Sequence, residues 1–504
     1  MKYILVLDVG TTNVKGLAYS MEGELIEDLE RRASTSYPHP GWVEQDPAEL
    51  MDVVGSIIEK MISLHGKPLG VGLTNQRSST VLWDKRTGEP YYNMITWQDT
   101  RTVDLVNEFS SKPLVKFGRG LGKIVSGISK ALPFIRKTGR GGYLATLSFT
   151  KFGTSHSSMH IRWIMDNIEG LKDKIERGEA AFGTIDSWIA WNLTGNHVTD
   201  YTNASATGLF DPFYKKWSEN ILKITGIPEE ILPRLIPNDE KIGVIKGHEI
   251  PFLTMIADQQ AALYMGGVSP GTVKMTNGTG TFVDMNVGKK PIGGGRGIFP
   301  MISLKSGDRV HYMLEGFVKS TGSAIDWLIK VGLMDDYSDI SKACRDIERG
   351  CTLTFIPALS GLGSPYERPE IKGVLKDITS STSREEIIRG MVTGIAMRCT
   401  EVIGSLESLS GKKVDKVLAE GGMSKSDDFL QLVSDLSGKK ILRPTYLNGS
   451  AYGAYMMAKA VYKGKDPVEF WHQPKIGKIF TPRDRDYEDF KERWEKCIES
   501  NIEK

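Results

Sequence analysis

The first stretch that could do chemistry is a turn near the N-terminus. An apolar run ends in Asp8, Gly10, Thr11, Thr12 and Asn13 follow, and the chain then becomes apolar again. This pattern predicts a β-hairpin whose glycine lets the backbone approach a ligand and whose hydroxyls add donors beside the turn amides. Such a turn suits phosphate oxygens, and the carboxylate at the strand end could hold a hydrated Mg²⁺ that bridges them.

A similar turn recurs in the second half of the chain, at residues 272–282. Asn277, Gly278, Thr279 and Gly280 repeat the glycine-threonine pattern between two apolar runs. Two such hairpins favour a protein of two similar halves that close on one nucleotide.

A third glycine-rich turn, Gly421 and Gly422, directly follows an apolar run. In a strand-turn-helix unit the amides of the helix start face a phosphate, and the absent side chains leave room for a base or ribose. The motif is weak alone and supports the nucleotide site only together with the hairpins.

One carboxylate stands where a proton acceptor would be useful. Residues 251–257 are apolar, Asp258 and Gln259 follow, and small residues then begin a helix. We expect the helix start to lower the pKa of Asp258, which would keep it ionised and able to accept a proton from a hydroxyl. The alternative is a helix N-cap without a catalytic role.

Polar and aromatic side chains follow two further apolar runs. Gln76 and Arg77 end one of them, and Trp97 stands in a second block with Asp99 and Arg101. At strand ends these groups could line a pocket, where the polar groups bind hydroxyls and the indole supplies a flat apolar wall. The alternative is a set of surface ion pairs beside a core tryptophan.

The composition is that of an ordinary globular protein. The chain has 504 residues, of which 40% are hydrophobic and 25% charged, and its net charge is +2. No leader or long apolar run predicts secretion or a membrane span, and four scattered cysteines are typical of reduced thiols in a cytosolic protein. The length predicts two domains, 1–250 and 251–504.

The order of predicted elements indicates an α/β fold. Residues 3–31 predict three strands of an antiparallel meander, Asp46 and Pro47 predict the start of a helix that runs to Leu64, and residues 69–73 predict another strand. Strands followed by a helix and a further strand describe a mixed sheet with helical cover.

A basic insertion is expected at about 112–153. From Lys112 to Lys151 it carries nine Lys or Arg residues and no Asp or Glu. Residues 124–135 predict an amphipathic helix between glycine-rich turns at 118–122 and 139–142. A segment that carries only positive charges could attract an anionic substrate, a nucleic acid or a membrane surface. The favoured interpretation, however, is a solvated insertion that is mobile or packs against an acidic neighbouring subunit.

Taken together, these segments resemble the FGGY family of carbohydrate kinases, and the glycerol kinases most closely within it. The similar segments are GWVEQDP, TNQR, VLWDKRTGEP, TWQDTRT, FGTIDSWIAWNLTG, VTDYTNAS, ADQQAAL, NGTGTF and EGGMS. The resemblance implies two actin-like, ribonuclease-H-like domains with a nucleotide cleft between them. It implies that ATP binds there and that its γ-phosphate passes to a primary hydroxyl of a small polyol or sugar.

The resemblance also implies roles for individual residues. Asp258 would be the general base, and Asp8 would help to bind Mg²⁺. The residues implied near the nucleotide are Thr11, Thr12, Asn13, Gly278, Thr279, Gly322, Gly421 and Gly422. The residues implied near the acceptor are Gln76, Arg77, Trp97, Asp258 and Gln259.

Three positions depart from the glycerol kinase pattern. Ser78 stands where those kinases carry a glutamate, Ser155 where they carry an aromatic hydroxyl residue, and His160 where they carry a lysine. Losing two hydroxyl-binding groups from a buried site could cost about 1 to 3 kcal/mol each for the original ligand. A smaller lining could admit a longer polyol or a ketopentose such as xylulose or ribulose.

Two other interpretations stay open. The two-hairpin architecture also serves nucleotide-operated, actin-like binding proteins, although the blocks at Gln76, Trp97 and Asp258 argue against one. Alternatively, the basic insertion is a binding arm for nucleic acid or another anion, although nucleic acid is not the favoured partner. We expect a cytoplasmic protein without a membrane span, assembled as a homodimer or homotetramer.

Overall fold

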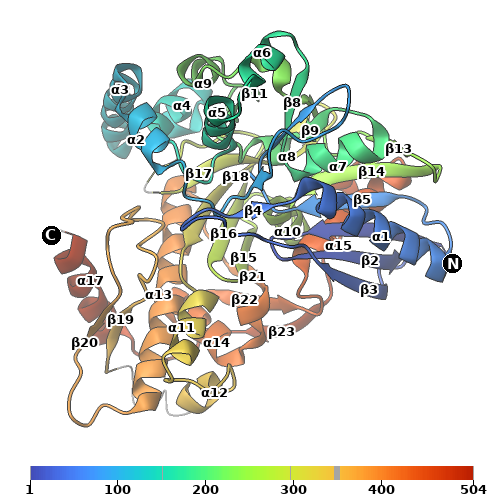
Figure 1. The fold of residues 1–504 in the computed structure, drawn as a ribbon. Coiled ribbons are helices and arrows are strands. Elements are labelled where there is room, and N and C mark those ends of the chain that lie inside the picture. Colours follow the sequence, from blue (N-terminus) through green and yellow to red (C-terminus); the bar gives the residue numbers. More distant parts are fainter. Residues whose placement is uncertain (1, 150, 296, 345–351, 503–504) are drawn as a thin grey trace.

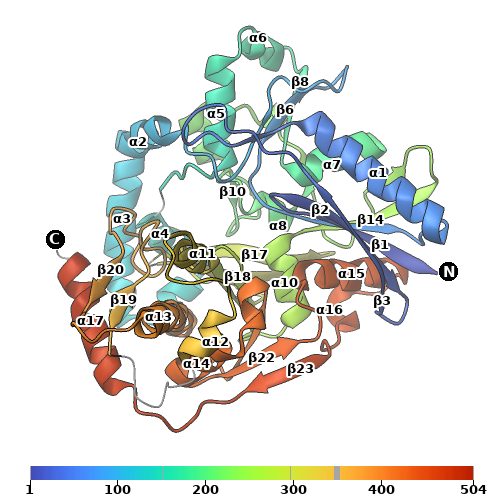
Figure 2. The same ribbon diagram turned by 60° about the horizontal axis from the view of Figure 1, so that its bottom comes forward.

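The computed structural model describes residues 2–149, 151–295, 297–344 and 352–502. Two mixed β-sheets, each with helical cover, form the two halves of the molecule, and α10 (Asp258–Gly266) and α15 (Gly449–Tyr462) pack between them (Figures 1 and 2). Within the described residues no helix is both long and apolar enough to cross a bilayer.

The first sheet begins with the predicted meander. Its strands, in spatial order, are β13 (Gly243–Ile245), β14 (Ile250–Ala257), β5 (Val71–Asn75), β1 (Tyr3–Val9), β2 (Asn13–Ser20) and β3 (Leu25–Arg32). β1 pairs antiparallel with β2 and parallel with β5, and β5 pairs parallel with β14. The central strands are buried on both faces, which explains their nearly continuous apolar sequences.

The helix predicted after Asp46 is α1 (Pro47–His65). The Asp46 carboxylate accepts a hydrogen bond from the backbone N–H of Ala48 at 2.8 Å, and Pro47 takes the first helical position, where no backbone donor is needed. The apolar face of α1 covers β2, where Gly16 leaves room for Ile57.

The second sheet repeats the hairpin and adds parallel strands. Its strands, in spatial order, are β17 (Phe299–Ser306), β18 (Arg309–Val318), β16 (Thr281–Gly288), β15 (Val273–Asn277), β21 (Lys416–Glu420), β22 (Lys440–Pro444) and β23 (Ile476–Phe480). β15 pairs antiparallel with β16 and parallel with β21, as β1 does with β2 and β5. In both sheets, therefore, the first strand of an antiparallel hairpin also pairs with a parallel strand on its other side.

Short strands and further helices complete the fold. The remaining strands are β4 (Glu44–Gln45), β6 (Val81–Asp84), β7 (Met94–Ile95), β8 (Ala180–Gly183), β9 (Val198–Asp200), β10 (Phe210–Asp211), β11 (Lys216–Trp217), β12 (Arg234–Ile236), β19 (Thr354–Ile356) and β20 (Val374–Lys376). The remaining helices outside the insertion are α2 (Val103–Ser111), α5 (Ser157–Asn167), α6 (Leu171–Glu176), α7 (Ile185–Thr194), α8 (Tyr201–Ala204), α9 (Glu219–Thr225), α11 (Gly322–Lys330), α12 (Asp339–Cys344), α13 (Arg384–Ser410), α14 (Asp427–Ser437), α16 (Pro467–Phe470) and α17 (Glu488–Ile502), with 3₁₀ turns η2 (Glu229–Ile231) and η4 (Gly422–Lys425).

The basic insertion is helical, and the predicted turn at residues 118–122 is wrong. It comprises α3 (Pro113–Ala131), the 3₁₀ turn η1 (Pro133–Lys137) and α4 (Gly139–Leu147). Gly122 lies inside α3 because α4 packs there: a Cβ atom on it would lie 2.3 Å from the Ser148 nitrogen. The second predicted turn, at 139–142, is the first turn of α4. The glycines therefore mark close helix packing.

The first sheet extends past residue 250. β14 begins at Ile250 and pairs with β5 along its length, because its apolar residues fill the first half's core beside Val71 and Leu73. The chain passes to the second half only after β14, through α10.

The contact between α10 and α15 gives a stability prediction. A Cβ atom on Gly453 in α15 would lie 1.9 Å from the Ala261 carbonyl oxygen, whereas Gly404 in α13 faces open space. We expect Gly453→Ala to lower the free energy of unfolding by about 1 to 3 kcal/mol through overpacking. Gly404→Ala, the matched control, should raise it by about 0.5 to 1 kcal/mol. Urea unfolding followed by circular dichroism measures both, and equal shifts would contradict the tight contact.

Candidate active site

Three parallel strands deliver the predicted site residues to one edge of the first sheet. Asp8 on β1 lies opposite Thr74 on β5, and Asn75 on β5 lies opposite Ala257 on β14. Because parallel strands end at the same edge, Asp8, Arg77 and Asp258 come together there although they are far apart in the chain.

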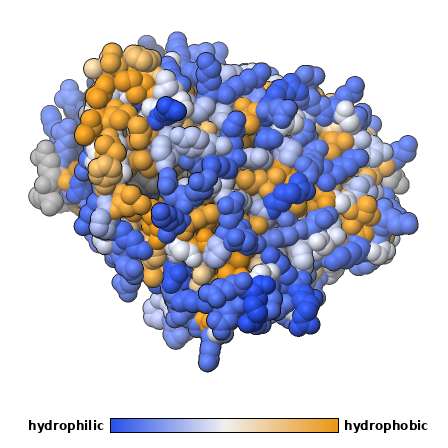
Figure 3. All heavy atoms as spheres, turned by 90° about the horizontal axis from the view of Figure 1, so that it is seen from above, coloured by the Kyte–Doolittle hydropathy of each residue, from blue (hydrophilic) through white to orange (hydrophobic). Residues whose placement is uncertain are grey.

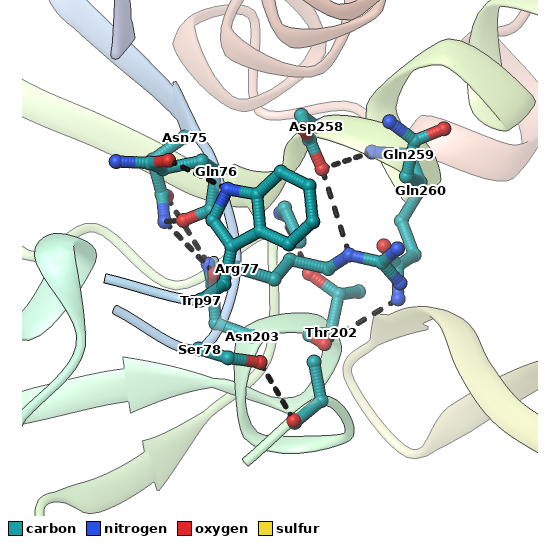
Figure 4. A network of polar contacts seen from close by, with 12 residues as sticks. Asn75, Gln76, Arg77, Ser78, Trp97, Thr202, Asn203, Asp258, Gln259 and Gln260 are labelled. Atoms are coloured by element: carbon teal, nitrogen blue, oxygen red, sulfur yellow. Dashed lines mark hydrogen bonds and ion pairs between the residues drawn. The ribbon is translucent and has the colours of Figure 1, made fainter. Parts of the chain in front are cut away.

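Asp258 pairs with Arg77 (Figure 4). The Arg77 Nε atom lies 3.6 Å from Asp258 Oδ1, and the same oxygen accepts a hydrogen bond from the Gln259 backbone N–H at 2.7 Å. Asp258 is the first residue of α10 and not its N-cap, and its side chain is 28% exposed. It can therefore contact a ligand while held by Arg77.

The expected direction of the Asp258 pKa is wrong. Burial raises the pKa of Asp258, although Arg77, the Gln259 N–H and Lys274 each oppose the rise. Desolvation outweighs the favourable position at a helix start because most of the Asp258 side chain is covered by protein. A raised pKa makes this carboxylate a stronger base once it is ionised.

Arg77 also reaches the second half of the molecule. Its Nη1 atom lies 2.7 Å from Glu315 Oε2 on β18, and its guanidinium lies 5.3 Å from the centre of the Phe282 ring on β16. Arg77 and Glu315 side chains are 10% and 8% exposed. A buried ion pair thus joins the two halves beside Asp258.

Gln76 links the first hairpin to Trp97. Its Oε1 atom accepts a hydrogen bond from the Trp97 indole N–H at 3.0 Å (Figure 4). The same oxygen accepts a hydrogen bond from the Thr11 hydroxyl at 2.6 Å. Gln45 adds a further bond from its Nε2 atom to the Thr11 carbonyl at 2.8 Å. The turn that is predicted to bind phosphate and the aromatic wall are therefore held in one network.

Gln259 contacts a buried ion pair of the second sheet. Its Oε1 atom accepts a hydrogen bond from Lys274 Nζ at 2.7 Å, and Lys274 Nζ also lies 2.5 Å from Asp284 Oδ2. Lys274 and Asp284 face each other across β15 and β16 and are fully buried. Burial raises the pKa of Asp284, and the Lys274 ammonium opposes this rise.

Asp8 lies close to the start of α15. Its Oδ2 atom accepts a hydrogen bond from the Ser450 hydroxyl at 3.2 Å. The pKa of Asp8 is raised to about 6, chiefly by burial and in part by the nearby Asp258 carboxylate. The described residues contain no cluster of three or more His, Cys, Asp or Glu side chains arranged to hold a metal, but a cation beside Asp8 would relieve the repulsion between these two carboxylates.

The second hairpin borders a large cavity. A cavity of about 900 Å³ is lined by Gly278, Thr279, Gly322 and Gly422. Further lining residues that the sequence did not single out are Asp326, Tyr337, Ser338, Ser341, Lys425 and Asp428. Four of the predicted nucleotide residues thus share one cavity, and its volume suits a small-molecule ligand.

Two glycines of this cavity's rim need to lack side chains. Gly421 has φ +89°, and a Cβ atom on it would lie 2.7 Å from the Asn277 carbonyl oxygen. A Cβ atom on Gly322 would lie 2.7 Å from the Gly278 carbonyl oxygen, and the Gly322 N–H donates to that oxygen at 3.0 Å. Gly421 is next to the lining residue Gly422 and packs against the backbone of Asn277, at the end of the strand that leads into the second hairpin.

The start of α15 connects both hairpins. Glu420, at the end of β21, accepts hydrogen bonds from the Gly449 N–H at 3.2 Å and from the Thr276 hydroxyl beside the second hairpin. Ser450, the next residue of α15, donates a hydrogen bond to Asp8 beside the first hairpin.

Two other residues of the first hairpin were predicted to lie near the nucleotide. Thr12 is exposed, whereas the Asn13 side-chain amide donates a hydrogen bond to Glu30 on β3.

Two of the three positions that depart from the glycerol kinase pattern, Ser78 and His160, have partners in the structure. Ser78 has φ +67°, and its hydroxyl donates to the Ala206 carbonyl at 2.8 Å. His160 is buried, its Nε2 atom lies 2.7 Å from the Thr154 carbonyl, and burial lowers its pKa to about 4. His160 is therefore neutral near pH 7 and cannot supply the charge of a lysine.

Asp99 and Arg101 belong to a buried ion cluster. The Arg101 side chain is fully buried, lies 2.8 Å from both Glu44 and Asp99, and stacks 3.9 Å from the centre of the Trp42 ring. The prediction that Asp99 and Arg101 line a pocket is therefore wrong. They form ion pairs, as in the alternative interpretation, but these ion pairs are buried and do not lie at the surface.

The sequence reasoning missed Lys274, Asp284 and Glu315. Each is a charged residue within a largely apolar strand. This pattern could have indicated buried ion pairs, because a charge buried in a sheet needs a partner. Their partners are distant in sequence, so the pairing itself could not be predicted.

Two models of known protein-family domains match most of the chain. The model of the FGGY carbohydrate kinase N-terminal domain matches residues 3–119 and 131–264, and that of the C-terminal domain matches residues 273–461. The chain therefore belongs to the FGGY family of carbohydrate kinases, and it has the two-domain α/β fold of that family. It is an ATP-dependent kinase that transfers a phosphoryl group to an alcohol.

Individual proteins are similar to this chain over nearly their whole length. The chain is 35% identical to an uncharacterized sugar kinase of Archaeoglobus fulgidus, with 98% of each chain covered, and 34% identical to glycerol kinase 2 of Thermotoga maritima, with 98% of this chain and 100% of the relative covered. The crystal structure of Plasmodium falciparum glycerol kinase with ADP superimposes with a TM-score of 0.87 at 31% identity and covers 99% and 98% of the two chains.

The pKa of Asp8 gives a prediction for the metal-free protein. Its value is about 6 in the folded protein against 3.8 for the free group, so the folded state holds more protons between these values and loses stability as the pH rises through them. The quantity to compare is the free energy of unfolding of Asp8→Asn minus that of the wild type, both measured in EDTA. This difference should be about 1 to 3 kcal/mol larger at pH 8 than at pH 4. Urea titrations across this range test it, and a difference independent of pH would refute the buried charge.

Proposed function

We propose that the acceptor of this kinase is glycerol or a polyol of similar size. The observation that carries this proposal is the Arg77–Asp258 pair, which lies beside the Gln76–Trp97 network at the junction of the two halves. Charged and amide groups on one side and an indole on the other suit a short chain of hydroxyl-bearing carbons. The relatives named glycerol kinases support the same acceptor.

In the proposed reaction Asp258 is the general base. Its carboxylate takes the proton from a primary hydroxyl, the hydroxyl oxygen forms a bond to the γ-phosphorus of ATP, and the bond from that phosphorus to the β-phosphate oxygen breaks to release ADP. Arg77 orients the acceptor through donors that its ion pairs leave available, since a guanidinium has five N–H groups. Gln259 contacts the acceptor through its amide nitrogen, because Lys274 occupies its oxygen.

The nucleotide is proposed to bind across both hairpins. Gly278, Thr279, Gly322, Gly421 and Gly422 would surround it at the cavity, and the phosphates would extend to the first hairpin. The first-hairpin contacts are Thr11, Thr12 and Asn13. Mg²⁺ would be held through Asp8 with water and phosphate oxygens, and when bound it would neutralise charge on the phosphates.

A ketopentose is the second candidate acceptor. The Ser78 side chain donates to the Ala206 carbonyl, and it is shorter than the glutamate that glycerol kinases carry at this position, which favours a longer acceptor. The actin-like binding protein is not favoured, because the chain belongs to a kinase family. Cytoplasmic localisation fits an ATP-dependent enzyme, and a homodimer or homotetramer stays a prediction.

An acceptor panel tests the proposed substrate. With ATP and Mg²⁺, and with ADP formation as the readout, we expect the largest kcat/KM for glycerol and values at least about tenfold lower for xylulose and ribulose, which corresponds to about 1.4 kcal/mol in the transition state. The opposite ranking would transfer the proposal to the ketopentose, and ADP formation that no acceptor increases would contradict both.

Replacement of Asp258 tests the proposed base. Asp258→Asn preserves the shape of the side chain but cannot accept the proton, so we expect kcat to fall about 10²- to 10⁴-fold. ATP affinity, measured by calorimetry, should change little. Asp415→Asn, which alters an exposed aspartate, is the matched control. A kcat near that of the wild type would remove Asp258 from the mechanism.

A further inference from the structure

The helix α3 presents a row of apolar side chains to solvent. In Figure 3 hydrophobic residues gather at the upper left, on the side where α3 lies in Figure 1. These residues recur every three or four positions along α3 and continue into η1, so they form one band that we call the apolar stripe. The apolar stripe consists of Leu114, Phe117, Leu121, Ile124, Ile128, Leu132 and Phe134, each 41% to 64% exposed.

The exposure of this stripe does not come from a loosely attached segment. α3 packs closely against α4 at Gly122. The Arg136 carbonyl accepts a hydrogen bond from the Gly293 N–H at 2.8 Å, and the Thr146 hydroxyl accepts one from the Gly294 N–H at 3.0 Å. The insertion is thus fixed to the second half of the molecule on one side, while the stripe faces outward.

Cationic side chains accompany the stripe. Lys116 and Lys123 are exposed and lie two helical turns apart on one side of α3. The whole segment from Lys112 to Lys151 has nine basic residues and no acidic one. An amphipathic helix with a basic flank and a row of Leu, Ile and Phe is the pattern of helices that lie in the plane of a membrane surface.

We propose that α3 and η1 dock this kinase on a membrane surface that contains anionic lipids. The apolar stripe would enter the boundary between headgroups and acyl chains, and Lys116 and Lys123 would contact headgroup phosphates. The arrangement requires no spanning helix, and it leaves α4 and η1 bound to the loop at 293–294.

Two other occupants fit the surface less well. The spacing of three and four residues would also allow pairing with α3 of a second copy, but each copy brings the same positive charge and no acid within the segment to offset it. A nucleic acid would favour aromatic side chains on which bases stack, whereas five of the seven stripe residues are aliphatic.

The middle of the stripe lies outside the residues that match the common kinase domain. The family model matches residues 3–119 and 131–264 and leaves out 120–130, which contains Leu121, Ile124 and Ile128. None of the stripe residues belongs to the proposed active site. Their replacement should therefore change membrane binding without changing kcat for a soluble acceptor.

Sedimentation of the full-length protein with vesicles tests the proposal. We expect it to bind vesicles of equimolar phosphatidylglycerol and phosphatidylcholine at low salt, and to bind pure phosphatidylcholine at least about tenfold more weakly. Salt at about 0.5 M should weaken binding to the anionic vesicles. Failure to bind the anionic vesicles would overturn the proposal.

Variants of the exposed residues identify the binding surface. Phe117→Ser with Ile124→Ser should weaken vesicle binding about tenfold or more, and Lys116→Ser with Lys123→Ser should weaken it on anionic vesicles alone. Ile378→Ser with Ile479→Ser, which removes side chains 57% and 55% exposed elsewhere, is the control and should bind as the wild type does. Unchanged binding of the first variant overturns the proposal, and so does a fall from dimer to monomer mass in that variant, which would assign the stripe to a second copy.

Discussion

The site depends on the two ion pairs of Arg77. This side chain leaves the edge of the first sheet, pairs with Asp258 on the same half and with Glu315 on the other, and lies over Phe282. Removing one partner of such a buried set leaves a charge without compensation, at a cost of about 3 to 5 kcal/mol. Arg77 therefore fixes the position of the proposed base and the spacing of the two halves together.

Burial makes the carboxylates of this site responsive to cations. It raises the pKa of Asp8, Asp258 and Glu420, and Asp258 adds to the rise at both of the others. The protein supplies Arg77 and Lys274 as fixed positive charges against them. A site with this balance favours ligands that bring further positive charge, which agrees with the proposed role of Asp8 toward a magnesium-bound nucleotide.

The sequence predicted the parts of this fold that local chemistry decides. The meander from β1 to β3 and the Asp46 cap follow from apolar runs, turn residues and capping preferences, and all are confirmed. Glycines were harder to interpret, because Gly122 serves helix packing and a turn would use the same residue. The pKa of Asp258 and the partners of Arg77 depend on burial and on distant strands, which no local pattern contains.

The account rests on one arrangement: the acceptor hydroxyl lies between Asp258 and the γ-phosphate of a nucleotide bound at the second hairpin. A crystal structure of Asp258→Asn with glycerol, Mg²⁺ and a non-hydrolysable ATP analogue measures it directly. The account predicts a primary hydroxyl of glycerol within about 3.2 Å of the residue 258 side chain and in line with the γ-phosphate. Glycerol bound away from residue 258, or a nucleotide outside the cavity at Gly278 and Gly422, would contradict it.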